Sequence, residues 1–193
     1  SPTHRAAMKC GKRPGAQPHV LGDFVWTAVD YLGEAGIGSS GFFPPDPRAC
    51  AGRYGFCPQG WPFISSNCGD VDLAGHVKPS GRYRAVLFNA SLIELAVALP
   101  TPAGATGGEV LSKWGYPAEL QSWNWHDGEG SQIQGGRSEL GRWLTVRIYS
   151  RCTAVQLLIN GRSIRTQPSP PTPRLTAQYR LRFEPGVLTA ICL

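Results

Sequence analysis

The chain has 193 residues, which is enough to bury a hydrophobic core but too few for a complete barrel of eight β/α units, which needs about 250 residues. Hydrophobic residues make up 41% of the sequence and charged residues 17%, a balance that argues against intrinsic disorder over most of its length. The net charge is +6, with nine basic and six acidic residues in 1–91 and ten and seven in 92–193. Because this charge is evenly spread, it indicates a solvated surface, and we expect no nucleic acid partner.

The sequence predicts no membrane-spanning segment. Its longest apolar stretch, Leu92 to Leu99, has only eight residues and contains Glu94, whereas a spanning helix needs about 20. The first residues lack both an initiator Met and an apolar signal core, so we expect the sequence to begin inside a longer protein. The cellular compartment stays open, and we expect no membrane partner.

In chain order, the first predicted element is a strand. The run from His19 to Tyr31 is rich in β-branched and aromatic residues and shows little alternation. This pattern is typical of a strand buried on both faces, as in a parallel sheet covered by helices. The segment from Gly33 to Gly60 is rich in Gly and Pro and predicts a long loop. Pro79 and Ser80 are suited to a helix start, which predicts a helix from about 80 to 89.

Two domains are predicted, and they join near residue 91. A single parallel strand needs neighbours that this chain does not supply, so residues 1–91 indicate the end of a larger barrel or open sheet. Residues 92–193 predict an antiparallel β-sandwich instead, because six short runs in them have strand composition. These runs are Leu92–Leu99, Leu144–Tyr149, Ala154–Ile159, Ser163–Thr166, Leu175–Phe183 and Val187–Cys192. Asn160 and Gly161, between two of the runs, tolerate the positive φ angles of a two-residue type I′ hairpin turn.

The polar residues form no self-contained catalytic or metal site. The six cysteines and four histidines lack the spacing of zinc ligands, so we expect no metal. Disulfides and free buried thiols remain alternatives for the cysteines. Asp70 and Asp72 are expected to make hydrogen bonds within a loop. Trp26 and Asp30 come near the end of the predicted strand, where barrel enzymes build their sites, and an indole face suits the C–H face of a sugar. On the pattern alone, a tryptophan in the core remains the alternative.

Seven segments, in order along the chain, carry a resemblance to a known family. The most specific is residues 22–38, GDFVWTAVDYLGEAGIG, which contains Trp26, Asp30 and Glu34. The others are residues 61–63, 67–75, 78–79, 123–125, 144–150 and 155–161. Together they resemble glycoside hydrolase family 2 enzymes of the β-galactosidase type. The earlier segments are similar to the eighth barrel strand, the last loop and the last barrel helix, and the later ones to the module that follows the barrel.

The resemblance implies a fold in two parts, α/β followed by all-β. Residues 1–91 would be the C-terminal end of a glycoside hydrolase TIM barrel, an incomplete barrel represented by its last βα unit. Residues 92–193 would be an immunoglobulin-like antiparallel β-sandwich domain. The chain would then pack against the missing N-terminal part of the same protein.

The resemblance also implies a function in carbohydrate metabolism, retaining hydrolysis of O-glycosyl bonds, with a β-glycoside or oligosaccharide as substrate and no cofactor. Trp26 would form the floor of the sugar subsite, Asp30 would be a structural hydrogen-bond partner at the barrel mouth, and Glu34 a loop residue near the entrance. Retaining hydrolysis needs two carboxyl groups about 5–5.5 Å apart, and in the family both are glutamates on earlier strands. We therefore expect no catalytic residue in this chain and no activity of the chain in isolation.

Two alternative functions are non-catalytic. Trp114, Trp123, Trp125 and Trp143 would line a sugar groove in a carbohydrate-binding module, although packing within and between domains also explains tryptophans at this density. Six arginines on the predicted strands would suit a protein-interaction or nucleic-acid module, although strand alternation places some of them on an ordinary solvated face. These arginines are Arg147, Arg151, Arg162, Arg165, Arg180 and Arg182.

Overall fold

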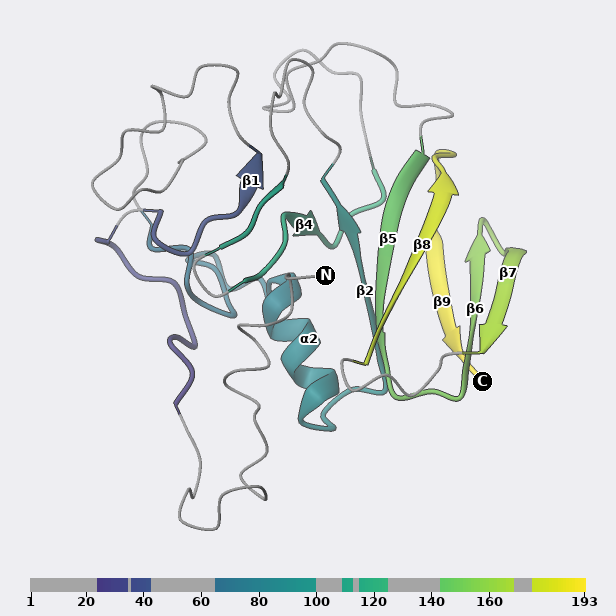
Figure 1. Cartoon of the computed structure of the whole chain (residues 1–193), viewed down its shortest axis with the longest axis horizontal. Helices are drawn as coiled ribbons and strands as arrows, with labels where there is room; N and C mark the ends of the chain where they lie inside the picture. The colour runs from purple at the N-terminus through teal and green to yellow at the C-terminus, as the bar shows by residue number, and fades with distance from the viewer. Residues whose placement is uncertain are drawn as a thin grey trace. The chain divides into compact units, whose positions relative to one another are not determined.

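The computed structural model describes residues 24–34, 36–42, 65–99, 109–112, 115–124, 143–168 and 175–193. Part of the predicted strand 19–31, most of the predicted loop 33–60, and Trp114 and Trp125 lie outside these residues. The chain divides into two compact units, whose elements are labelled in Figure 1. Unit 1 comprises residues 1–78 and 104–118, and unit 2 comprises residues 79–103 and 119–193. The predicted boundary near residue 91 and the assignment of the two domains stay predictions.

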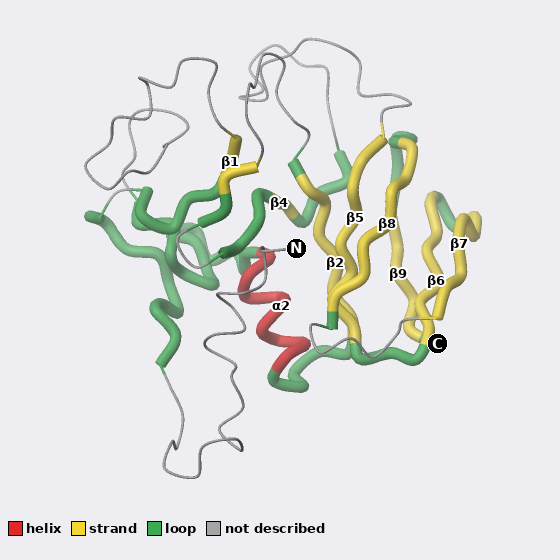
Figure 2. The backbone as a smooth tube through the Cα atoms, viewed as in Figure 1, coloured by secondary structure: helices red, strands yellow, loops and turns green. Residues whose placement is uncertain are grey.

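Unit 2 contains two antiparallel sheets and one helix, seen as yellow and red tube in Figure 2. The first sheet has four strands in the order β4-β2-β5-β8, and the second has three in the order β7-β6-β9. The bounds are α2 Pro79–Leu87, β2 Ile93–Ala98, β4 Glu119–Leu120, β5 Trp143–Ser150, β6 Ala154–Ile159, β7 Arg162–Pro168, β8 Thr176–Arg182 and β9 Leu188–Cys192. The helix and all six strand runs predicted from the sequence are confirmed, with bounds that differ by a few residues.

The two sheets enclose one hydrophobic core. Alternate residues of β5 point into it, namely Leu144, Val146 and Ile148, and so do Val155, Leu157 and Ile159 of β6. This period of two is what a strand produces when one of its faces is buried. Because both sheets contribute to one buried cluster, the arrangement agrees with the predicted antiparallel β-sandwich. Its immunoglobulin-like topology stays a prediction.

The turn between β6 and β7 has the geometry expected of its two residues. Ile159 pairs with Arg162, so the loop contains only Asn160 and Gly161. Their φ angles are 52° and 77°, as a type I′ turn requires. The Asn160 side chain also accepts a hydrogen bond from the Val187 backbone N–H at 2.9 Å, which ties this turn to the start of β9.

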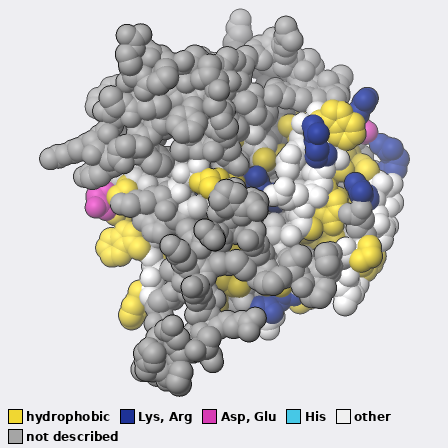
Figure 3. All heavy atoms as spheres, in the orientation of Figure 1, with side chains coloured by type: hydrophobic (Ala, Val, Ile, Leu, Met, Phe, Trp, Pro, Cys, Tyr) yellow, Lys and Arg dark blue, Asp and Glu magenta, His cyan; other side chains and the backbone are white. Residues whose placement is uncertain are grey.

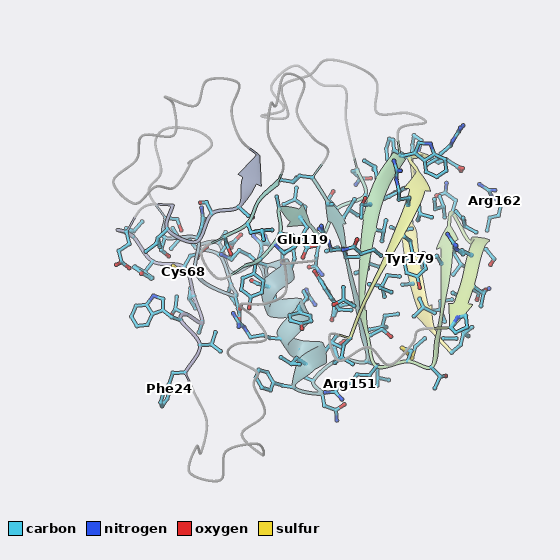
Figure 4. The ribbon with its side chains drawn as sticks, viewed as in Figure 1. Phe24, Cys68, Glu119, Arg151, Arg162 and Tyr179 are labelled. Carbon is cyan, nitrogen blue, oxygen red and sulfur yellow. A yellow bond between two sulfur atoms is a disulfide. The ribbon has the colours of Figure 1, made fainter. Side chains whose placement is uncertain are left out.

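A buried polar network lies on the face of the four-stranded sheet opposite the core. Glu119, labelled in Figure 4, accepts hydrogen bonds from the Arg147 guanidinium at 3.0 Å and from the Tyr149 hydroxyl. The Tyr149 ring in turn packs against Tyr83 of α2, with 5.0 Å between the ring centroids. Burial, followed by the nearby charge of Glu119, raises the pKa of Tyr149 well above its usual value. The network therefore links α2, β4 and β5.

Unit 2 also contains a disulfide between Cys152, in the loop after β5, and Cys192 of β9, with 5.4 Å between their Cα atoms. A disulfide was one of the two alternatives that the sequence left open for the cysteines. The bond ties the β5–β6 connection to the last strand. In unit 1, Cys68 is a free, buried thiol, which is the other alternative. Cys10, Cys50 and Cys57 lie outside the described residues.

The described part of unit 1 is mostly irregular, with the two-residue strands β1 (Gly41–Phe42) and β3 (Glu109–Val110) paired antiparallel. The predicted strand buried on both faces is wrong for residues 24–31. Phe24 is fully exposed and points away from its segment in Figure 4, and Trp26 is 61% exposed. The physical reason is that this segment pairs through backbone hydrogen bonds with a loop, and Val29 forms a parallel bridge with Val71 instead of lying between two strands. The barrel part of the predicted fold class is not confirmed.

Among the described residues, no helix has the length and apolar character that crossing a membrane requires.

Candidate functional site

The predicted site residues lie in unit 1, where residues 27–38 run beside residues 65–71. Backbone hydrogen bonds join the two segments: the Asp30 N–H donates to the Val71 carbonyl at 2.8 Å, and the Ser66 N–H donates to the Tyr31 carbonyl at 2.9 Å. Gly69 is required for this close approach, because a Cβ there would collide with the backbone of Asp30 and stand 2.7 Å from the Val71 carbonyl oxygen. The pairing fixes the backbone that carries the predicted residues.

Asp30 is buried, and its carboxylate is fully engaged. Oδ1 accepts a hydrogen bond of 2.6 Å from the Gly69 N–H. The Lys78 ammonium lies 3.0 Å from Oδ1 and 2.9 Å from Oδ2. A buried carboxylate is stable only when it is paired and hydrogen-bonded in this way. The carboxylate is thus held by protein groups, and the Asp30 side chain is almost completely buried.

Trp26 and Glu34 meet at a third side chain, Tyr31. The Trp26 indole Nε1–H donates to the Tyr31 hydroxyl at 3.1 Å, and the same hydroxyl donates to Glu34 Oε2. The two aromatic rings are perpendicular, at an interplanar angle of 87°, with centroids 6.0 Å apart. We refer to Trp26, Tyr31 and Glu34 as the aromatic cluster. All three side chains are reachable from solvent.

The backbone after Tyr31 explains how Glu34 reaches back to it. Gly33, Glu34 and Gly36 have positive φ angles of 99°, 41° and 74°. These left-handed conformations fold the chain into a tight turn, for which glycine is the natural residue. The hydrogen bond to Glu34 is the main cause that raises the pKa of Tyr31 from 10.0 to about 12, because it stabilises the protonated phenol beside the carboxylate.

The chemistry of the aromatic cluster suits binding of a polyhydroxylated ligand. An exposed indole face packs against the C–H groups of a sugar ring, while a phenol and a carboxylate exchange hydrogen bonds with its hydroxyl groups. Trp26 and Glu34 were predicted from the sequence, whereas Tyr31 was missed. Its signal was present, since Tyr31 precedes Glu34 by three residues at the exit of the apolar run.

Asp72, another polar residue of unit 1, has a structural role. Asp72 Oδ1 accepts hydrogen bonds of 2.8 Å from the backbone N–H groups of Ala74 and His76, which confirms the expected role in a loop. The bond from the His76 N–H is the main cause that lowers the pKa of Asp72. Within the described ranges, no three His, Cys, Asp or Glu side chains gather in a way that would hold a metal ion.

Comparison with known proteins gives three kinds of match. A family model described as "Domain of unknown function (DUF4982)" matches residues 141–193, which are the sandwich strands from β5 to β9. Among curated proteins, the β-galactosidase BoGH2A of Bacteroides ovatus is 26% identical over 189 residues, covering 98% of this chain and 15% of that protein.

Two solved structures are also similar. A glycosyl hydrolase family 2 member from Bacteroides cellulosilyticus matches with a TM-score of 0.65 and 28% identity, over 90% of this chain and 20% of that one. A β-glycosidase from Bacteroides vulgatus matches with a TM-score of 0.54 and 21% identity, over 97% and 16% of the two chains. The chain thus spans only about a fifth of these relatives or less. The matches confirm the resemblance found in the sequence, to the C-terminal region of glycoside hydrolase family 2 proteins.

Proposed function

We propose that this chain, as a relative of the C-terminal region of glycoside hydrolase family 2 enzymes, supplies one wall of the sugar subsite of a β-galactosidase-like retaining hydrolase. The observation that carries the proposal is the aromatic cluster, an exposed indole held by a phenol that is itself hydrogen-bonded to a carboxylate. The substrate class is a β-glycoside or oligosaccharide.

The cluster is suited to its role because the indole is held in place before a ligand arrives. A free tryptophan loses rotamer freedom when it binds a ligand, and this loss weakens binding. Here the hydrogen bond from Nε1 to the Tyr31 hydroxyl already restricts the ring, and its 61% exposure leaves surface for a sugar. Glu34 keeps one carboxylate oxygen, Oε1, for a sugar hydroxyl while Oε2 is bound to Tyr31.

Asp30 contributes to this subsite as a positioning residue. Its carboxylate anchors the Gly69 N–H and the Lys78 ammonium, and the next residue along the chain is Tyr31. Loss of this anchor would move the backbone that carries the cluster. Asp30 therefore affects sugar binding through Tyr31 and Trp26 and not by direct contact.

In this proposal the two catalytic carboxyl groups come from outside the 193 residues. Asp30 is buried in an ion pair, and Glu34 is hydrogen-bonded to a tyrosine whose pKa is raised to about 12, so neither matches an acid/base and nucleophile pair. Apolar side chains that remain exposed in unit 1 give the rest of the enzyme a surface to pack against. They are Phe24, Val29, Leu32, Leu73 and Val77.

Sugar binding tests the subsite. Saturation-transfer NMR with methyl β-galactoside is expected to show contact with the purified chain, and Trp26→Ala is expected to weaken the signal at least severalfold. Phe88→Ala is the matched control, because Phe88 is an exposed aromatic residue of unit 2 that belongs to neither the aromatic cluster nor the sandwich strands. Absence of any transfer, or an equal loss in both variants, would refute the proposed subsite.

Hydrolysis tests the location of the catalytic pair. The chain alone is expected to leave an aryl β-galactoside intact. Turnover by the pure chain that disappears in Glu34→Gln would place a catalytic carboxylate within these residues, against the proposal.

A further inference from the structure

The six arginines predicted on the strands of unit 2 divide into those that hold the fold together and those that do not. Arg147 is the buried ion-pair partner of Glu119. Arg151 donates hydrogen bonds to carbonyl groups in the last turn of α2, and Arg162 forms an exposed ion pair with Glu184 at 2.9 Å. Figure 4 labels Arg151 and Arg162 at opposite ends of the sandwich strands. Arg165 lies 5.9 Å from the centre of the Tyr179 ring.

The remaining two, Arg180 and Arg182, gather around one aromatic ring. Trp143 of β5 pairs directly with Arg182 of β8, and Arg180 is two residues away on the same face of that strand. The guanidinium carbon atoms lie 5.2 Å (Arg182) and 5.8 Å (Arg180) from the centre of the Trp143 ring. Trp143 is 50% exposed, and both arginines are exposed. Figure 3 shows basic side chains beside hydrophobic ones on this unit.

This cluster holds two positive charges close together, and no carboxylate of the described residues forms an ion pair with them. Within the described ranges, neither Arg180 nor Arg182 forms an ion pair, whereas the nearby Glu184 is bound to Arg162. Side chains two residues apart on a strand are separated by about 7 Å. The indole attracts each guanidinium to its π-system and restricts its motion, while the planar N–H groups of a guanidinium can still bind an oxyanion in bidentate fashion.

From this geometry we propose that Trp143, Arg180 and Arg182 form a binding site for an acidic polysaccharide, whose carboxylate or sulfate groups are bound by the two guanidinium groups. The site lies on the sandwich and uses no residue of the aromatic cluster, so it goes beyond the proposed sugar subsite. A glycosidase that retains an acidic glycan on a separate domain gains effective concentration of substrate near its active site.

The observations favour a glycan over a nucleic acid. Strong DNA binding comes from neutralising many phosphates, about 6–10 in typical complexes. Here Arg147, Arg151 and Arg162 are already engaged in hydrogen bonds or ion pairs with protein groups. Two anchored guanidinium groups suit a few anionic groups on a sugar chain, and the indole edge adds contact area for its rings.

Affinity gel electrophoresis of the full chain tests the site, with polygalacturonate as the carboxylate probe, dextran sulfate as the sulfate probe and neutral dextran as the background. We expect retardation by at least one acidic probe, loss of most of it in Arg182→Gln, Arg180→Gln and Trp143→Ala, and none by dextran. Arg162→Gln is the matched control, since it removes the same charge from a residue that is already paired with Glu184.

The results also identify the anion and test the alternatives. Retardation by polygalacturonate or by dextran sulfate alone assigns the site to carboxylate or to sulfate, and both support the proposal. Equal weakening by Arg162→Gln, equal retardation by neutral dextran, or tighter binding of duplex DNA than of either acidic glycan would overturn it.

Because Arg180 and Arg182 are exposed, their glutamine variants are expected to keep the circular dichroism spectrum of the unmodified chain. Since Trp26 lies in unit 1, Trp26→Ala is expected to leave the retardation unchanged, so failure of this site and failure of the sugar subsite are distinguishable.

Discussion

Lys78 Nζ lies 2.9 Å from Asp30 Oδ2, although 48 positions separate the two residues in the sequence. The Asp30 side chain is almost completely buried, and the Lys78 side chain is 23% exposed. The same carboxylate accepts the Gly69 N–H. A single buried group therefore connects the segment that carries Trp26 and Tyr31, the loop at Gly69, and the residue that precedes α2 in the sequence.

Asp30→Asn is expected to destabilise unit 1 by about 3 kcal/mol. The substitution leaves the Lys78 ammonium without its partner, and breaking a buried ion pair costs about 3–5 kcal/mol, with the lower end appropriate to a partly exposed lysine. Hydrogen exchange measured by mass spectrometry should show faster exchange at residues 27–38 and 65–71, where backbone hydrogen bonds join the two segments.

Asp72→Asn is the control for this change, since it also removes one negative charge from unit 1 and retains an acceptor for the backbone N–H groups of Ala74 and His76. Exchange in both segments is expected to stay close to that of the unmodified chain. If Asp30→Asn has no larger effect than Asp72→Asn, the ion pair does not hold these segments together.

The aromatic cluster predicts a tyrosine that titrates late. Tyr31 has a pKa raised to about 12, mainly by its hydrogen bond to Glu34, so Glu34→Gln is expected to bring that pKa down toward 10.0. Because the folded-state pKa is higher than the unfolded one, the bond stabilises the fold fully below pH 10 and loses this effect as the pH rises toward 12. Carbon NMR of the labelled phenol, assigned with Tyr31→Phe, measures the titration. An unchanged pKa in Glu34→Gln would exclude Glu34 as the cause.

The disulfide of unit 2 is expected to contribute about 3 kcal/mol to stability, because it closes a long loop in the unfolded chain. Its two cysteines are 40 residues apart. The Cys152→Ala/Cys192→Ala double variant should therefore unfold at lower urea concentration than the oxidised chain, and reduction should have a similar effect. Cys68→Ala serves as the control, since it removes a buried thiol from unit 1 and is expected to leave unfolding of the sandwich unchanged. A double variant as stable as the oxidised chain would contradict the assignment.

The sandwich was predictable because its signals are local. Asn160 and Gly161 specify their own turn through the φ angles that they tolerate, and the strand before them, β6, alternates between partly buried and buried residues. The signal for the helix start at Pro79 was equally local. The failed strand at 24–31 has apolar composition without alternation, and such a run becomes a buried strand only where neighbouring strands cover it. Composition could not reveal that this segment pairs with a loop at Val71.

The candidate site was also predictable only in part, although here the missed contact is local. Trp26 and Glu34 were identified from the sequence, but the residue that joins them, Tyr31, depends on the turn made by Gly33 and Gly36. The pairing of Cys152 with Cys192 likewise depends on β9 lying beside β6, which no local pattern specifies. Long-range pairing therefore accounts for most of what the sequence did not reveal.

Tyr149 and Glu119 predict a loss of stability of unit 2 at alkaline pH. Burial and the charge of Glu119 raise the pKa of Tyr149 well above 10.0, so between pH 10 and that higher value the unfolded chain releases a proton that the folded chain keeps. Each pH unit in this window lowers the free energy of unfolding by about 1.4 kcal/mol. Tyr149→Phe is expected to reduce this slope, and the part that remains comes from Tyr179, whose pKa is also raised by burial. Loss of one donor to Glu119 lowers stability by about 1 kcal/mol at neutral pH. Urea unfolding on either side of pH 10 measures both effects. Tyr31→Phe provides the comparison, because Tyr31 belongs to unit 1 and should leave the slope of the sandwich transition intact. A slope that is undiminished in Tyr149→Phe would assign the alkaline loss to another group.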